Sequence, residues 1–154
     1  MKVISKNKKA FFDYEIIEKF VAGVVLQGHE VKSIKAGHVS LDGAYVFVKP
    51  GEAILRNAIV PPWTHANRTS LAGYEPARDR GLLLTKKQIN LIVGKRKEIR
   101  AIVVPLAIGT EKNLVKLEIG LARPLRKYDK KNRRKERDEK LAVQRKKKTV
   151  ETRW

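Results

Sequence analysis

The sequence contains no cysteine, which excludes disulfide bonds and permits a reducing compartment. Long apolar runs are missing too. The longest, residues 101–108, is interrupted by Pro105 and falls far short of the ~20 residues that span a bilayer. The first nine residues lack the apolar stretch of a signal peptide. We therefore expect a cytoplasmic protein that makes no membrane contact.

Acidic side chains are scarce relative to basic ones. The chain holds 35 Lys and Arg residues against 16 Asp and Glu residues, which gives a formal net charge of +19. An excess of this size repels itself in a compact protein and is typical of proteins that bind nucleic acid. The alternative is a solvated basic surface that serves only solubility. The composition favours a polyanionic partner.

The basic charge is concentrated towards the C-terminus. Residues 123–154 carry 15 basic and 5 acidic side chains, a net charge of +10. Their few large apolar side chains bury too little area to offset the entropy of ordering the segment. We therefore predict a domain at 1–122 and a basic tail at 123–154 that is disordered when free. Because the tail is rich in Lys, Arg and Glu, we expect it to become helical where phosphates relieve its self-repulsion.

The first 122 residues are predicted to be mainly β. Strands are expected at 11–26, at 44–48 and 53–57 around a Pro-Gly turn, at 99–108, and at 114–120, where apolar and charged residues alternate. A glycine-containing turn at 109–113 separates the last two strands. The segment 61–80 lacks periodicity and is predicted to be a long surface loop, a common place for contacts.

Two helices are predicted between the strands. One spans residues 28–37, between two glycines. The other begins with a capping box formed by Thr85 and Gln88, and Gly94 is expected to end it. About six short strands in one domain favour a small antiparallel β-barrel, since closure removes exposed strand edges.

Candidate catalytic and metal-binding groups are few. The three histidines, His29, His38 and His65, do not have metal-ligand spacing, and no cysteine is present to complete a zinc site. A ribonuclease would need an acid–base pair such as His29 with Glu30, or His38 with Asp42. Neighbours of this kind occur by chance, and no glycine-rich phosphate loop precedes a helix. We expect a binding protein that uses no cofactor, and not an enzyme.

Several sequence blocks resemble one known family. They are Asn7-Lys8-Lys9-Ala10, Gln27-Gly28-His29-Glu30-Val31-Lys32-Ser33-Ile34-Lys35-Ala36-Gly37, Leu82-Leu83-Leu84-Thr85-Lys86-Lys87, Lys116-Leu117-Glu118-Ile119-Gly120-Leu121-Ala122-Arg123, Lys127-Tyr128-Asp129-Lys130-Lys131 and Lys135-Glu136-Arg137-Asp138. In this order, over about 140 residues, the chain resembles the SmpB family, the SsrA (tmRNA)-binding proteins of bacteria.

The resemblance implies a fold and a task. The fold is an OB-fold-like six-stranded antiparallel β-barrel with two or three flanking helices and a basic C-terminal tail. The protein would bind the tRNA-like domain of tmRNA as a monomer and, with elongation factor Tu, deliver alanyl-tmRNA to stalled ribosomes. Its tail would enter the empty decoding site and the mRNA channel. The family has no catalytic role of its own.

The resemblance also implies an RNA-binding surface on the barrel. Lysine side chains neutralise phosphates, while Glu30 is a natural acceptor for base N–H or 2′-OH donors. The alternative for Glu30 is that it tempers the local charge or favours a helix N-terminus. For Lys86 and Lys87, the alternative is that they only form a solvated surface of their helix and do not bind RNA. The implied residues are Asn7, Lys8, Gly28, Glu30, Lys32, Ser33, Lys35, Lys86, Lys116 and Arg123.

In the tail, the resemblance implies contacts with the ribosomal decoding site. The ring of Tyr128 matches a position where the family carries a ring that can stack on an unpaired base. The alternative is that Tyr128 is a loose hydrophobic side chain at the edge of the domain. Two departures affect the placement of the tail: Pro124 stands where glycine is expected, and Lys131 stands where arginine is commoner. The implied tail residues are Tyr128, Asp129, Lys130, Lys131, Lys135 and Arg137.

Charge alone leaves a second function open. A general basic OB-fold protein, such as a ribosomal component or RNA chaperone, would share the composition. It would bind many RNAs with a steep salt dependence and little selectivity.

Overall fold

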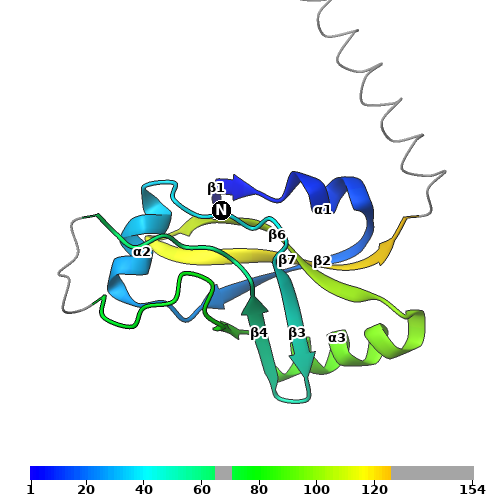
Figure 1. Cartoon of the computed structure of the whole chain (residues 1–154). Helices are drawn as coiled ribbons and strands as arrows, with labels where there is room; N and C mark the ends of the chain where they lie inside the picture. The colour runs from blue at the N-terminus through cyan, green and yellow to red at the C-terminus, as the bar shows by residue number, and fades with distance from the viewer. Residues whose placement is uncertain (65–70, 126–154) are drawn as a thin grey trace, which may run out of the picture. The chain divides into compact units, whose positions relative to one another are not determined.

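The structure, a computed structural model, describes residues 1–64 and 71–125 (Figure 1). Its strands are β1 (Lys2–Lys6), β2 (Tyr14–Val24), β3 (Tyr45–Lys49), β4 (Glu52–Arg56), β5 (Arg80–Leu83), β6 (Ile102–Glu111) and β7 (Leu114–Pro124). Its helices are α1 (Lys8–Asp13), α2 (Gly28–Lys35) and α3 (Lys86–Ile99). Met1–Arg123 forms one compact unit.

Six of the strands close on themselves by hydrogen bonding. The order in the sheet is β1-β6-β3-β4-β5-β2-β7, and a further pairing joins β7 back to β6. Strands β1 and β3 pair with different parts of β6, at Thr110 to Ala107 and at Val103 respectively, so β1 is an addition to the ring. The predicted antiparallel, mainly β fold is confirmed, with seven strands instead of six.

The pairings with a described register are all antiparallel. Two ion pairs indicate that β2 and β7 are antiparallel as well. Glu15 lies 3.4 Å from Arg123, and Lys19 lies 3.8 Å from Glu118, so residue numbers rise on one strand as they fall on the other. The neighbours in this ring therefore run in opposite directions all the way round.

Two hairpins fix the register of the ring. The predicted hairpin around Pro50-Gly51 is confirmed, with Lys49 opposite Glu52. The second joins β6 to β7 and is tighter than predicted, because Glu111 pairs with Leu114 across only two residues. Those residues, Lys112 and Asn113, have φ angles of 49° and 66°, the left-handed conformation that matches the twist of a two-residue turn.

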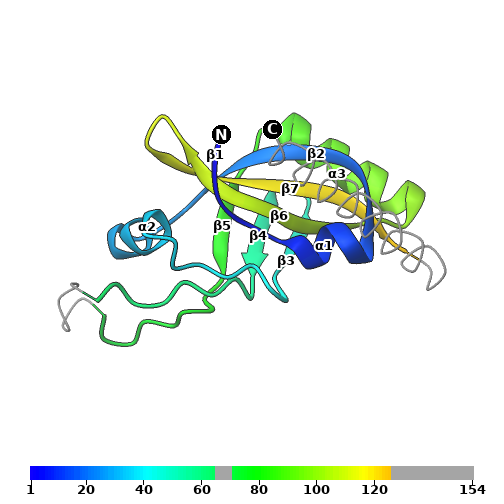
Figure 2. The ribbon, with the colours of Figure 1, turned by 90° about the horizontal axis from the view of Figure 1, so that it is seen from above.

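The core lies inside the ring, and a smaller cluster lies under α1. The main cluster takes alternate residues from the strands and is closed by Ile34 of α2 and Ile92 of α3, both fully buried. The second cluster packs Ala10 of α1 against Leu106 and Ala122 on β6 and β7. The three helices thus each cover a different part of the strands (Figures 1 and 2).

The N-terminal prediction was wrong at residues 11–13, which belong to a helix and not to a strand. Asn7 caps this helix, since its side-chain Oδ1 accepts a hydrogen bond from Ala10 N at 3.2 Å. Strand β1 was not predicted. It lies close to β6 at Gly109, where an added Cβ would come within 2.1 Å of the Lys2 carbonyl oxygen. Gly109 therefore permits strand pairing and is not part of a turn.

Helix α3 runs past the predicted end at Gly94. Its capping box of Thr85 and Gln88 is confirmed. Ile99 packs against the core one turn beyond Gly94. Burial of that side chain offsets the roughly 1 kcal/mol that a glycine costs inside a helix. The helix ends at Arg100, which adopts a left-handed conformation.

The remaining predictions on organisation concern residues that are only partly described. In the segment 61–80, Arg80 is buried in β5, so that end is not a surface loop. His65 and the tail beyond residue 125 lie outside the described residues. Across 1–64 and 71–125, no helix is long and apolar enough to cross a bilayer.

Candidate nucleic-acid interface

Helix α2 carries exposed basic side chains, and contacts from its inner face hold the helix in place. Its first turn is fixed by Glu30, whose Oε1 accepts a hydrogen bond from Gln27 N at 2.8 Å. Its inner face buries Ile34 in the core. Ser33 Oγ donates to the Pro61 carbonyl at 2.9 Å. With these groups facing inward, Lys32 and Lys35 remain exposed on the outer side.

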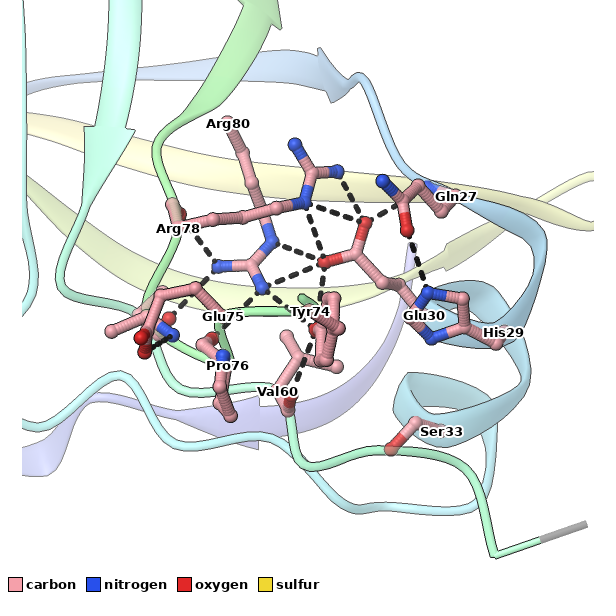
Figure 3. Close-up of polar contacts among 12 residues, drawn as sticks. Gln27, His29, Glu30, Ser33, Val60, Tyr74, Glu75, Pro76, Arg78 and Arg80 are labelled. Carbon is pink, nitrogen blue, oxygen red and sulfur yellow. Dashed lines mark hydrogen bonds and ion pairs between the residues drawn. The ribbon is translucent and has the colours of Figure 1, made fainter. Parts of the chain in front are cut away.

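The Glu30 side chain projects from this helix towards two arginines that bind its carboxylate, and it is completely buried (Figure 3). Arg78 Nε lies 3.2 Å and 3.1 Å from its two oxygens, and Arg78 also forms an ion pair with Oε1. Arg80 donates from Nε to Oε2 at 2.8 Å. Removing one partner from a buried pair leaves an uncompensated charge, so each group requires the others.

Arg80 satisfies every donor of its guanidinium. Besides Glu30, its acceptors are the carbonyl oxygens of Ala58, Arg78 and Pro76 at 2.9–3.0 Å, and the Tyr74 hydroxyl at 3.2 Å. An arginine side chain has five N–H donors in a fixed planar fork. The side chain therefore ties residues 74–78 to the end of β4 and to α2 at once.

Tyr74 closes the cluster from the side of the segment 71–79. Its hydroxyl lies 3.0 Å from Glu30 Oε2 and 2.9 Å from the Val60 carbonyl oxygen, so its single proton can go to either. Burial and the nearby Glu30 carboxylate raise the pKa of Tyr74. The ring also meets His29 edge-on, with centroids 4.5 Å apart. The cluster formed by Glu30, Tyr74, Arg78 and Arg80 is called the Glu30 network below.

The Glu30 carboxyl titrates well below its usual range. Burial is the largest single influence and raises its pKa. Hydrogen bonds from Arg78, from Gln27 N and from Arg80 together outweigh burial and lower the pKa from 4.5 to about 2. Glu30 is therefore ionised throughout the physiological range.

This shift predicts acid sensitivity of the fold. Because the pKa is lower in the folded state, the stabilisation is fully present above pH ~5 and is lost as pH falls through about 2. The total is about 3 kcal/mol, at 1.36 kcal/mol for each pKa unit. In urea unfolding at pH 6 and pH 3, wild type should lose about 2 kcal/mol more than Glu30→Gln. Equal losses in the two proteins would contradict this assignment.

Three predicted contact residues have buried side chains. Glu30 and Ser33 point into the protein, and Asn7 caps α1 while its Nδ2 donates to the Pro105 carbonyl at 2.9 Å. The expectation that the Glu30 side chain lies on a basic surface was wrong, since two arginines and a helix N-terminus hold it inside. The capping geometry matches the alternative, that Glu30 favours the start of a helix.

The other described residues of the predicted surface are accessible, but they are spread over the fold. Gly28, Lys32 and Lys35 gather on α2. Lys8 lies on α1, and Arg123, paired with Glu15, lies at the far end of β7. Lys86 is in the first turn of α3, and Lys116 is half-buried on β7. The residues that the structure brings together are those of α2.

The arginines and the tyrosine of the Glu30 network were missed by sequence reasoning. In a strand, every second side chain faces the same side of the sheet. Because Leu82 faces the core, this alternation predicts a buried side chain at Arg80. No comparable pattern marks Tyr74 or Arg78, because they lie in irregular backbone. Their position is set by the distant Glu30.

The His29–Glu30 pair of the ribonuclease hypothesis is not placed for acid–base catalysis. The ring of His29 interacts with Gln27, with Nε2 and Oε1 2.6 Å apart, and Glu30 is occupied by both arginines. Among the described residues, no three His, Asp or Glu side chains are placed to hold a metal ion.

Comparison with known proteins decides the family. The model of the SmpB protein family matches residues 4–149. The chain belongs to the SmpB family. It is 42% identical to the SsrA-binding protein of Sulfurihydrogenibium sp. over 93% of this chain and 92% of that protein. It is 43% identical to the SsrA-binding protein of Bacillus cytotoxicus over 94% and 91%.

A solved structure agrees with the sequence relatives. A chain of the structure described as "tmRNA-SmpB: a journey to the center of the bacterial ribosome" superposes with a TM-score of 0.64 and 36% identity. The match covers 82% of this chain and 91% of that one. SmpB proteins are RNA-binding adaptors, so the chain is an RNA-binding protein of this family and not an enzyme.

Proposed function

We propose that the chain binds the tRNA-like domain of tmRNA, as one monomer per RNA, through the surface around α2. The observation that supports this most directly is the pair of exposed lysines, Lys32 and Lys35, on a helix that the Glu30 network holds in one position. A helix held in one position fixes where the two lysine side chains leave the backbone, which favours one folded RNA over a flexible one. Glu30 acts as a positioning residue in this proposal.

The remaining steps of the proposal are those expected of an SmpB protein. With elongation factor Tu, the protein delivers alanyl-tmRNA to a stalled ribosome and places residues 123–154 in the empty decoding site and mRNA channel. SsrA-binding relatives match over nearly their whole length, and the structural neighbour comes from a tmRNA-SmpB ribosome complex. In the tail, Tyr128 stacks on an unpaired base, while Asp129, Lys130, Lys131, Lys135 and Arg137 contact ribosomal RNA. These events take place in the cytoplasm.

A paired substitution tests the α2 surface. Lys32→Gln/Lys35→Gln should weaken binding of the isolated tRNA-like domain and make the plot of log affinity against log salt shallower by about 1.8, at ~0.9 for each lost duplex phosphate contact. Affinity is measured by filter binding between 50 and 300 mM salt. The matched control removes two exposed cations away from α2, on β1 and in the β6–β7 turn, with Lys2→Gln/Lys112→Gly.

The outcomes separate the candidate functions. Loss of affinity in the α2 variant alone, with bulk tRNA unable to compete, supports the proposal. Equal losses in both variants, together with equal affinity for bulk tRNA, favour a general basic RNA-binding protein.

A further inference from the structure

A second basic surface lies at the opposite end of the fold from α2. The C-terminal half of α3 runs beside the β3–β4 hairpin, while α2 lies across the barrel from it (Figures 1 and 2). Between them, α3 and the hairpin form a groove of about 510 Å³. Val93 and Ile102 contribute to its apolar part, and its polar lining is Lys49, Arg96, Lys97 and Arg100. We call this the α3 groove.

The charge of the α3 groove is almost uncompensated. Among the residues described, its lining includes four cations and no acidic side chain. Lys49 pairs with Glu52 at 3.0 Å, but both groups are about half exposed, and such surface pairs contribute little. Arg96 is held in place by a hydrogen bond from Nη1 to the Val48 carbonyl at 2.9 Å. The groove therefore offers a partly fixed site for negative charge.

Arg100 adds an observation that helix termination does not explain. It ends α3 with φ 51° and ψ 42°, in the left-handed region. Glycine closes a helix in this conformation without the steric cost of a Cβ, roughly 1 kcal/mol. An arginine here places a guanidinium in the groove at a cost to stability. This cost is what retention of the Arg100 charge for binding would explain.

We propose that the α3 groove binds the phosphodiester backbone of an unpaired RNA segment, separate from the folded RNA at α2. Guanidinium groups bind phosphate in a bidentate manner, and the apolar floor suits a ribose or the edge of a base. Ile102 also borders the neighbouring groove that contains Tyr45, whose side chain is 43% exposed. An exposed ring beside a cationic groove is the arrangement of single-strand binding sites.

The groove gives the protein two RNA contacts that do not depend on each other. This inference extends the proposed function, but the residues that support it lie on α3 and β3 and not on α2. An acidic protein segment is the other class of partner with suitable charge. The exposed tyrosine favours RNA, because its ring can stack on an unpaired base beside the cationic groove.

The test uses the full chain and a single-stranded decamer containing 4-thiouridine. After irradiation, cross-linked peptides are identified by mass spectrometry, and affinity is measured as a function of salt. We expect cross-links at Tyr45 or within residues 93–102. Lys97→Gln/Arg100→Gly should remove most of these and lower the salt slope by about 1.4, at ~0.7 for each single-strand phosphate. Because glycine suits position 100, the variant remains folded.

A matched control removes two cations elsewhere, with Lys2→Gln/Lys112→Gly. Lys112 has φ 49°, so this change also relieves a left-handed residue. The control should leave groove cross-links unchanged, and the groove variant should bind the tRNA-like domain like wild type. Absence of groove cross-links, equal loss in the control, or displacement of the decamer from the groove by a stoichiometric Glu-rich peptide would overturn the inference. None of these results bears on binding at α2.

Discussion

Replacing Arg80 by alanine is expected to destabilise the protein by about 3–5 kcal/mol, as removal of one partner from a buried ion pair does. Its side chain is 1% exposed and provides five hydrogen bonds, so the substitution leaves Glu30 partly uncompensated and three backbone carbonyls without their donor. Urea unfolding followed by far-UV circular dichroism measures the change in free energy. A loss of this size approaches the whole stability of a small domain.

Two companion variants distinguish the geometry of Arg80 from its charge. Arg80→Lys keeps the charge but supplies three donors on one atom, which cannot reach acceptors arranged around a planar fork, so it should recover little stability. Arg78→Ala should cost less, because the Arg78 side chain is 26% exposed and water replaces part of its interaction. An Arg80→Lys protein within about 0.5 kcal/mol of wild type would show that charge alone suffices.

Deleting residues 124–154 is expected to abolish tagging on stalled ribosomes while leaving binding of the tRNA-like domain largely intact. Met1–Arg123 forms its own compact unit and includes all of α2 and the Glu30 network. The deletion removes nine net positive charges, so affinity for unrelated RNA should fall steeply. Reconstituted translation on a truncated mRNA measures tagging, and filter binding measures RNA affinity.

A conservative variant of the tail keeps its net charge. Tyr128→Leu removes the ring alone and should reduce tagging, if stacking on an unpaired base contributes the roughly 1–3 kcal/mol found for such contacts. If the deletion abolished binding of the tRNA-like domain as well, the tail would belong to the primary RNA site and the proposed division of labour would fail.

The fold was predictable where local signals and burial agree. The alternating residues of β7, the Pro-Gly turn between β3 and β4, and the capping box of α3 each indicated the element that formed. The errors fell where tertiary contacts outweigh local signals. Gly94 stays helical because Ile99 packs beyond it, and Gly109 lies in a strand because β1 approaches it closely.

The site was predictable only in part. The exposed positions of Lys32 and Lys35 could be predicted, because they follow from the helix alone, and the contact of these lysines with RNA stays a prediction. The role of Glu30 could not, since a carboxylate in a basic segment suggests a surface acceptor until its partners are known. Those partners come from 44 to 50 residues further along the chain. No local pattern encodes a contact of that separation.

The sequence separation within the Glu30 network has a consequence for the newly synthesised chain. Arg80 leaves the ribosome 50 residues after Glu30, which corresponds to about 3 to 10 seconds at ordinary rates of synthesis. During that interval the carboxylate of Glu30, which is buried in the folded protein, has no guanidinium group to neutralise it. The helix is short, and a helix of eight residues is unstable alone in water. We therefore expect the lysine-bearing surface of α2 to form only after β5 has been made, and the proposed RNA binding at α2 to require the same step.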